Sequence, residues 1–234
     1  MTDCVIECSG LGARAFLQGQ LTCNINDLKE NQPQITACCN LQGRVIFIAR
    51  VIMRNDQDFL LLISESMKNI VFSHLEKYAK FSKCSLSCID AVGATGWSPS
   101  YRKQDILNGI PNIYPETSEQ IIAQRLNLHL IDGAISFKKG CYLGQEIISR
   151  LHFKGKLKHH MYLGTLPNTV SLSLGEKIVN SLGEDTGIIV DYYVDQDKIL
   201  LLFVNTIENN HPKIETGQEI SLLPFPYSFK DETS

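Results

Sequence analysis

The eight residues from Lys139 to Glu146 hold the densest group of reactive side chains in this chain. Their order is Lys-Gly-Cys-Tyr-Leu-Gly-Gln-Glu, which places a thiol, a phenol, a carboxamide and a carboxylate around two glycines. Apolar spacing predicts a short strand over 134–137 and a helix over 146–151. Cys141 therefore falls on a predicted strand-to-helix turn, where the helix dipole and unpaired N–H groups favour a thiolate. Free cysteine is also a common core residue, so Cys141 alone does not decide between a structural and a reactive role.

The first ninety residues predict an α+β unit with the element order β-α-β-β-β-α-β. The expected strands are 3–8, 34–39, 44–51, 59–63 and 84–90, and the expected helices are 11–17 and 67–78. Residues 40–43 lie between two of these strands and predict a hairpin turn. We expect Ser64 or Ser66 to cap the second helix, and His74 to be a core histidine within its apolar stripe.

The rest of the chain changes character twice. Residues 93–120 are rich in Gly, Pro, Ser and Asn, which is typical of a connector. From residue 159 onward, short strands separated by turn clusters predict a small β-barrel without helices. These barrel strands are expected at 160–166, 176–179, 186–191, 198–204 and 219–222. We therefore expect two domains, 1–158 and 159–234.

Composition places the chain among globular proteins. It has 234 residues, of which 44% are hydrophobic and 20% charged, enough to bury a core. A formal net charge of -3 argues against a general nucleic-acid binder. The first residues lack the pattern of a secretory signal, and no uncharged apolar run approaches the roughly 18 residues of a membrane helix. We expect a cytoplasmic protein with no membrane contact.

The eight cysteines do not form a familiar framework. They occupy positions 4, 8, 23, 38, 39, 84, 88 and 141. No Cys-x-x-Cys pair is present, so neither a disulfide scaffold nor a structural zinc site is favoured. Most of these cysteines are expected to be small core residues.

The stretch 139–146, hereafter the signature turn, resembles the Lys-Gly-Cys-Tyr-x-Gly-Gln-Glu signature of the YgfZ family, folate-binding relatives of the glycine-cleavage T-protein. Segments similar to the family occur at 16–22, 127–128, 133–138, 150, 153–155 and 223–228. The resemblance implies a ferredoxin-like antiparallel N-terminal domain of the T-protein type, followed by a C-terminal β-barrel. Family members carry several dozen more residues between the strand near 88 and residue 106, so this domain is expected to be shortened.

The resemblance also implies a function. It indicates a folate-associated accessory protein for the maturation or repair of iron–sulfur enzymes, including tRNA-modifying enzymes, which would be its partners. Cys141 is then the reactive or cluster-handling thiol, with Lys139 favouring the thiolate. Arg150, one helical turn from Glu146, would hold that carboxylate in place. Because iron–sulfur centres need four ligands, Cys141 is expected to be a transient ligand, with no stable metal.

The implied cofactor is tetrahydrofolate or a related folate. Tyr101 aligns with an aromatic position associated with folate in the family and would stack on the pterin. Trp97 is nearby, but a packing role is favoured for it. Tyr142 and Gln145 would orient neighbours or bind the pteridine edge, and Asn127 is a further cofactor-binding candidate. The shortened lobe leaves open whether folate is retained and whether the chain is a monomer or a weak homodimer.

Two other functions stay in competition. T-proteins carry adjacent aspartates on a strand that corresponds to 43–50 here, and this stretch has no carboxylate. Aminomethyl transfer is therefore disfavoured, and a one-carbon transferase would need a different acid. The third hypothesis is a docking module. Lys154, Lys156 and Lys158 alternate along an expected strand and would share one face, either as guards of a sheet edge, the favoured interpretation, or as a site for RNA phosphate or a folate glutamyl tail.

Overall fold

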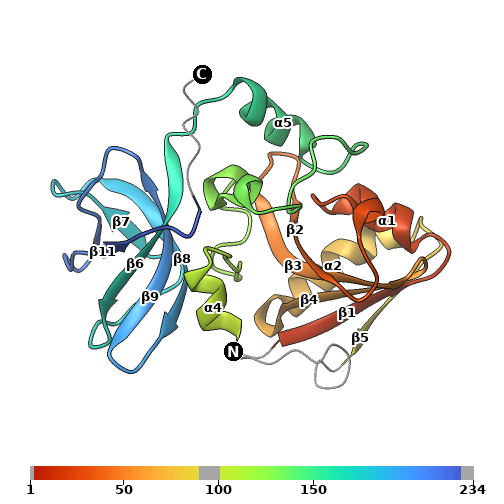
Figure 1. Ribbon diagram of the computed structural model, residues 1–234, viewed down its shortest axis with the longest axis horizontal. Helices are drawn as coiled ribbons and strands as arrows, with labels where there is room; N and C mark the ends of the chain where they lie inside the picture. The colour runs from red at the N-terminus through yellow and green to blue at the C-terminus, as the bar shows by residue number, and fades with distance from the viewer. Residues whose placement is uncertain (1–2, 90–100, 228–234) are drawn as a thin grey trace.

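The computed structural model describes residues 3–89 and 101–227. Two antiparallel sheets form its frame, with most of the segment 101–154 between them (Figure 1). Trp97, the first residues of the expected connector and the end of the strand expected at 84–90 lie outside the described residues. Within the described ranges, no helix is both long enough and apolar enough to cross a membrane.

The N-terminal sheet confirms the expected α+β unit. Its strands are β1 (Asp3–Ser9), β2 (Pro33–Cys39), β3 (Val45–Asn55), β4 (Asp58–Ser64) and β5 (Ser85–Ile89), and its helices are α1 (Ala13–Gln20) and α2 (Lys68–Ala79). The strand order is β2-β3-β4-β1-β5, in which the last four strands have the ferredoxin-like order and β2 extends the edge. Phe16 and Leu17 of α1 share a core with Val71 and Leu75 of α2, so both helices cover the same face of the sheet.

The start of α2 differs from the expectation. A 3₁₀ turn, Glu65–Met67, precedes α2. The N-cap residue of α2 is Met67, which has no side-chain oxygen. The hydroxyls of Ser64 and Ser66 lie 3.1 Å apart and bond to each other, so the predicted serine cap is wrong. His74 is a core histidine, as predicted: its Nε2 lies 3.3 Å from Cys38 Sγ, and burial lowers its pKa.

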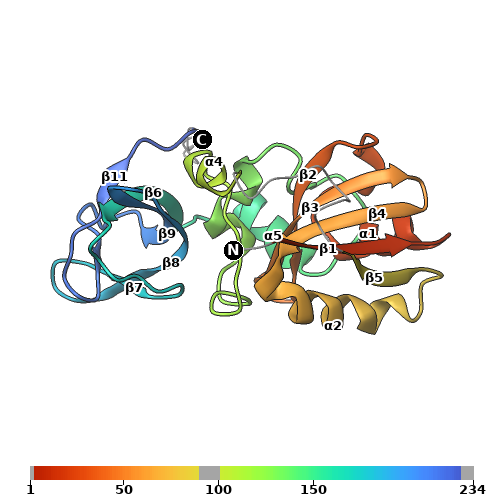
Figure 2. The same ribbon diagram turned by 90° about the horizontal axis from the view of Figure 1, so that it is seen from below.

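The C-terminal sheet curls into a half-barrel, which confirms the predicted barrel (Figure 2). Its strands, in the order β10-β7-β8-β9-β6-β11, are β6 (His159–Pro167), β7 (Lys177–Val179), β8 (Asp185–Val194), β9 (Lys198–Thr206), β10 (Lys213–Ile214) and β11 (Ser221–Leu223). The unbroken apolar run of β9 is explained by burial on both faces. Leu201 and Phe203 point into the half-barrel, whereas Leu200 and Leu202 join the main core. Because this main core includes side chains from both sheets, the domain division after residue 158 stays a prediction.

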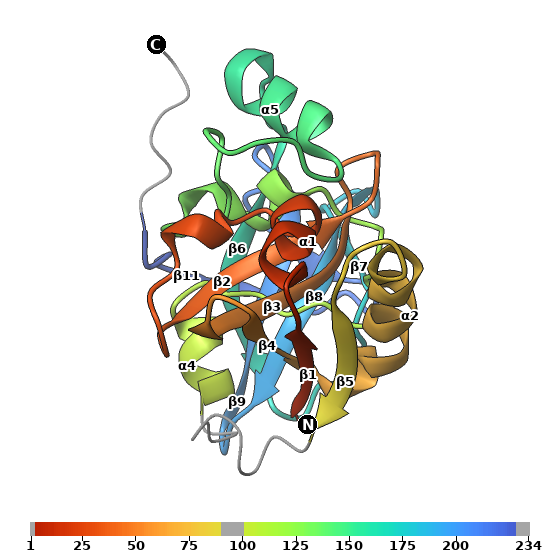
Figure 3. The same ribbon diagram turned by 90° about the vertical axis from the view of Figure 1, so that its right-hand side faces the viewer.

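The segment between the sheets contains two helices. α4 (Tyr101–Leu107) lies within the stretch whose composition indicated a connector, and it packs close to β8 and β9. α5 (Gln145–Lys154) is the helix predicted after the signature turn, and it projects beyond both sheets (Figures 1 and 3). Two 3₁₀ turns, Ala123–Leu126 and Leu128–Leu130, lie between these helices in the chain.

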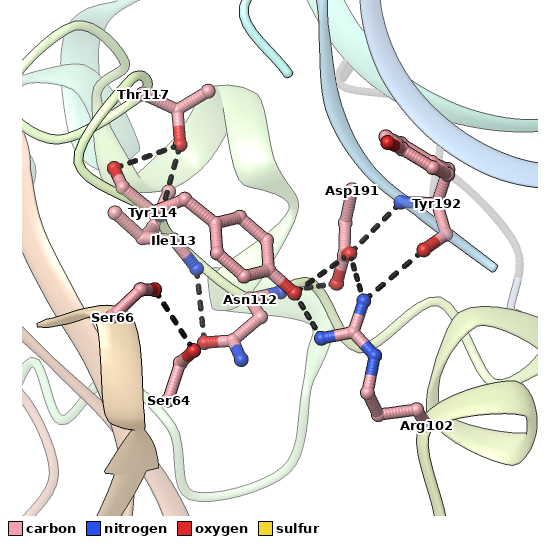
Figure 4. Close-up of polar contacts among 9 residues, drawn as sticks. All are labelled: Ser64, Ser66, Arg102, Asn112, Ile113, Tyr114, Thr117, Asp191 and Tyr192. Carbon is pink, nitrogen blue, oxygen red and sulfur yellow. Dashed lines mark hydrogen bonds and ion pairs between the residues drawn. The ribbon is translucent and has the colours of Figure 1, made fainter. Parts of the chain in front are cut away.

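A buried ionic network joins α4 to the half-barrel (Figure 4). Arg102 Nη2 donates to Asp191 Oδ1 on β8 at 2.6 Å, and Arg102 also bonds the Tyr114 hydroxyl. Tyr114 donates to the same carboxylate at 3.0 Å, and the backbone N–H of Asn112 donates to its other oxygen at 3.1 Å. Burial raises the pKa of the Asp191 carboxyl, and Arg102 and Tyr114 oppose that rise. A buried carboxylate is tolerated only with such partners, so the network fixes residues 102–114 against β8.

Gly144 allows the start of α5 to pack directly against the β2–β3 hairpin. It is the N-cap residue of α5 and adopts φ +78°, a conformation that L side chains rarely take. A Cβ at Gly144 would lie 2.5 Å from the carbonyl oxygen of Asn40 in the hairpin turn. The position therefore requires glycine both for its backbone angle and for the close approach. The predicted hairpin turn at 40–43 thus also serves as the seat of the signature turn.

The network at Asp191 generates a stability prediction. Asp191→Asn should lower the free energy of unfolding by about 3–5 kcal/mol, because the Arg102 guanidinium would stay buried without its counter-charge. Asp195 provides a matched control, since its carboxylate also binds α4, through Lys103 Nζ at 2.6 Å, but at the surface. Asp195→Asn should change stability far less. Urea denaturation followed by circular dichroism measures both variants, and equal losses would contradict a dominant role for Asp191.

The seat of α5 generates a second prediction. Gly144→Ala should destabilise the protein by more than about 1 kcal/mol, because alanine is strained at positive φ and its methyl meets the Asn40 carbonyl. Gly140→Ala is the control within the same turn, since no described atom lies within 4 Å of a Cβ built there. Unfolding midpoints in urea compare the two. A Gly144→Ala protein as stable as Gly140→Ala would show that α5 is not seated on the hairpin in this way.

Candidate functional site

The segment that leads into the signature turn is a series of turns, so the strand predicted over 134–137 is wrong. Its backbone bonds to single partners instead of a strand ladder. Thr22 Oγ1 donates to the carbonyl of Ala134 at 2.7 Å, and the N–H of Ser136 donates to the carbonyl of Thr22 at 2.9 Å. Apolar residues in this segment are buried because the chain crosses the core near Thr22, and not because they alternate along a strand.

Lys139 and Tyr142 form the inner side of the signature turn. Lys139 is 9% exposed, and its Nζ donates to the carbonyls of Leu21 and Cys23 at 2.6 and 2.8 Å. The same ammonium lies 4.8 Å from the centre of the Tyr142 ring, a cation–π contact. Burial lowers the pKa of Lys139 to about 8 and raises the pKa of Tyr142. In the described part of the chain, no hydrogen bond joins Lys139 to Cys141, so the expected support of a Cys141 thiolate by Lys139 is not found.

Cys141 lies on the outer side of the turn and is exposed. Cys88, on the edge strand β5, is the other exposed thiol among the eight free cysteines. Burial raises the pKa of the remaining six, which favours the protonated thiol over the nucleophilic thiolate. These six are Cys4, Cys8, Cys23, Cys38, Cys39 and Cys84. Access therefore separates Cys141 from most of the thiols of the chain.

The other signature residues lie at the start of α5. Gln145 is half-buried, and its backbone N–H donates to the carbonyl of Tyr142 at 3.2 Å. Glu146 and Arg150 are exposed, and no ion pair joins them among the residues that the structure describes. The expected role of Arg150 as a holder of the Glu146 carboxylate is therefore not supported by a contact.

The structure separates the predicted folate ligands from one another. Tyr101 begins α4, which lies on the opposite side of the molecule from α5 (Figure 1). It lines a pocket of about 40 Å³, together with Asp3, Arg50 and Asp105, into which Cys141 does not reach. Asn127 is fully buried, and its side chain bonds both the carbonyl and the N–H of Met161. Asn127 thus ties the central segment to β6.

A larger pocket, of about 290 Å³, lies beside the signature turn. Its lining residues are Asn24, Asp27, Leu28, Gln34, Gly133, Ile135, Ser136, Phe137 and Lys138. The apolar wall comes from Leu28, Ile135 and Phe137, while the Asp27 carboxylate and the Lys138 ammonium provide opposite charges. Both charged residues are exposed, and neither forms an ion pair within the described ranges. This pocket, which we call the Phe137 pocket, suits a flat heterocycle that carries both donors and an anionic group.

Sequence reasoning missed the Phe137 pocket because its two charged residues come from distant parts of the chain. Asp27 ends a 3₁₀ turn after α1, whereas Lys138 directly precedes the signature turn. Lys138 was the available signal, as a second lysine next to the signature. No three His, Cys, Asp or Glu side chains of the described residues gather closely enough to hold a metal ion.

The three alternating lysines also lie differently from the prediction. Lys154 is the last residue of α5, and Lys156 and Lys158 belong to the loop that precedes β6. The expected strand with lysines on one face is therefore wrong. The chain leaves the helix at Gly155, whose extended backbone starts this loop, and all three lysines are exposed.

Known proteins with similar sequences indicate the family of this chain. A protein of Haemophilus influenzae described as uncharacterized is 30% identical, over 94% of this chain and 90% of its own length. The tRNA-modifying protein YgfZ of Aliivibrio fischeri is 27% identical, over 97% of this chain and 91% of its own length. No family model matches the chain.

Among solved structures, the fold is similar to the glycine cleavage system aminomethyltransferase T from Bartonella henselae. The TM-score is 0.70 at 12% identity, over 96% of this chain and 83% of that protein. This likeness confirms the T-protein fold that the signature implied. Together with the relatives, it shows that the chain belongs to the YgfZ family.

Proposed function

We propose that this protein is a folate-associated accessory factor in tRNA modification, which helps to mature or repair iron–sulfur enzymes through the thiol of Cys141. Membership of a family whose relatives are named tRNA-modifying proteins supports the general role. The partners are then iron–sulfur client enzymes in the cytoplasm, met by a monomer or a weak homodimer. The observation that carries the proposal is the exposed Cys141 on a turn whose other side is fixed inside the protein.

The geometry of the turn suits a thiol that acts on another molecule. Cys141 is exposed, and Gly140 beside it leaves open space, so a large partner has access to the sulfur. Lys139 holds the turn from inside through two carbonyls, which gives the sulfur a defined position. One thiolate supplies one of the four ligands of an iron–sulfur centre, so the client or a small thiol provides the rest. Cys141 would therefore ligate iron transiently and lose its proton to solvent on binding.

The Phe137 pocket is the better candidate for the folate. Its volume of about 290 Å³ is just below the range of about 300–1,000 Å³ for small-molecule pockets, enough for the pterin ring but not the whole folate. The Asp27 carboxylate would accept hydrogen bonds from N–H groups at the pterin edge, and Lys138 would bind a carboxylate of the glutamyl tail. Phe137 supplies an aromatic wall. Tyr101, by contrast, lines a space of about 40 Å³, which admits water but no pterin.

The structure gives less support to the alternative function, a one-carbon transferase. Asp3 and Asp105 do line the pocket of Tyr101, and burial raises the pKa of both carboxyls, which is the property of a general acid. However, Asp105 is already ion-paired with Arg50 at 2.6 Å. A pocket of about 40 Å³ leaves no room for folate beside these groups. Formation of methylene-tetrahydrofolate from an amine donor by the purified protein would nevertheless reverse this ranking.

The role of Cys141 generates a genetic prediction. When Cys141→Ala is expressed in a strain that lacks the protein, thiolated tRNA nucleosides should stay at the level of that strain without the variant, because the accessible thiol of the turn is lost. Cys88→Ala is the matched control, since it removes the other exposed thiol, and it should restore thiolation fully. Mass spectrometry of hydrolysed tRNA gives the level, and immunoblots confirm equal amounts of protein. Full restoration by Cys141→Ala would reject the thiol role.

The folate site generates a binding prediction. Calorimetric titration with 5-formyltetrahydrofolate, a stable reduced folate, measures this binding. Asp27→Asn should bind it at least about 10-fold more weakly than the wild type, because the charged acceptor of the pterin N–H groups is lost. Tyr101→Ala should bind as the wild type does. The opposite pattern would move the folate to the pocket of Tyr101. If the wild-type protein binds no folate at all, the folate part of the proposal is wrong.

A further inference from the structure

Positive charge is concentrated around α5 in an otherwise acidic protein. Residues 138–158 carry six Lys or Arg and one Glu, whereas the rest of the chain carries 16 Lys or Arg and 24 Asp or Glu. The formal charge is thus +5 for this segment and -8 for the remainder. Apart from the buried Lys139, these cations are exposed, and none of them forms an ion pair in the described ranges. α5, which carries Arg150 and Lys154 of these cations, projects from the molecule (Figure 3).

Three rings lie at the end of the same helix. The rings of Phe137 and His152 stack with centroids 3.8 Å apart and an angle of 13° between their planes. Phe153 meets His152 edge-on at 4.8 Å and is itself 69% exposed. Two ring contacts therefore hold a large apolar side chain at the surface, beside Lys154. We call Phe153, Lys154, Lys156 and Lys158 the α5 patch.

Ordinary structural roles do not account for the α5 patch. A cation in the last turn of a helix interacts favourably with the helix dipole, and this explains Lys154. It does not explain Lys156 and Lys158, which lie beyond the end of the helix. Lysines also guard exposed sheet edges, but these residues precede β6, which pairs with β9 along its length and with β11 in part.

We propose that the α5 patch binds single-stranded RNA, with a base stacked on Phe153 and the phosphates held by Lys154, Lys156 and Lys158. A single strand offers the two features that the patch complements, a regular row of negative charges and unpaired flat bases. An acidic protein segment offers the charges but not the bases. The inference goes beyond the proposed function, because it adds a direct RNA contact that does not depend on the Cys141 thiol.

Fluorescence anisotropy of the full chain with a labelled RNA of roughly 12 nucleotides tests the proposal. Phe153→Ala should weaken binding by about 5- to 150-fold, through loss of one stacked base. Exchange of the three lysines for glutamate should weaken it further and reduce the slope of log K against log salt by about 2, since three phosphate contacts are lost. A duplex RNA of equal length should bind less tightly than the single strand.

The chain offers a matched control at the end of α2. Lys77, Lys80 and Lys83 are also exposed and also lie beside an exposed ring, that of Phe81, which is 90% exposed. Exchange of these lysines for glutamate changes the net charge by the same amount, and Phe81→Ala removes the same ring. Both control variants should bind RNA within about 2-fold of wild type, apart from a long-range charge effect that salt screens.

Three outcomes would overturn the proposal. Equal losses of RNA affinity in the α5 patch variants and in the α2 control variants would show that binding depends only on the overall charge of the protein. Loss of RNA binding with the lysine variant but not with Phe153→Ala would show phosphate contacts without a stacked base, and the proposed recognition of a single strand would be wrong. Binding that does not weaken with salt would exclude phosphate contacts. The assay contains neither client enzyme nor thiolation readout, so its failure would leave the role of Cys141 untouched.

Discussion

The carboxylate of Asp191 is the constraint that holds α4 and the residues after it against the half-barrel. An ionised group with 3% exposure persists only if donors replace its water, and Arg102, Tyr114 and the N–H of Asn112 do so. All of these donors come from the segment between the sheets, so satisfying one charge on β8 fixes residues 102–114 of that segment. Arg102 and Asp191 also line the space beside Tyr101, which has a volume of only about 40 Å³. A space of this size beside Tyr101 does not hold the pterin that was expected to stack on its ring.

Local patterns predicted most of the fold, because the spacing of apolar residues along the chain indicates strands and helices. The order β-α-β-β-β-α-β and the run over 198–204 both follow from periodicity and length. The failures occur where a distant residue supplies the partner. Residues 134–137 are turns because Thr22 bonds their backbone. The partnership of Arg102 with Asp191 spans much of the chain, and no local signal announces it.

The candidate site shows a similar division. Residue types alone pointed to the signature turn, but adjacent residues in a turn can face opposite ways, and no period tells which one faces inward. Lys139 and Tyr142 turn into the protein, while Cys141 turns out. The pocket nearby was not predictable, because Asp27 and Lys138 meet only through the fold. Asn127 was chosen as a ligand by resemblance, yet its buried amide bonds the backbone of Met161 on β6.

The buried ammonium of Lys139 gives the signature turn its character. An apolar side chain would fill this space without the desolvation that lowers the pKa of Lys139 to about 8. Only a donor with several protons, however, can bond the carbonyls of Leu21 and Cys23 at once. These carbonyls follow α1, and Gly144 rests on the β2–β3 hairpin, so the turn is held from two independent elements. A thiol between two such anchors has little freedom to move, and its exposure therefore reflects a fixed position on the surface and not a flexible loop.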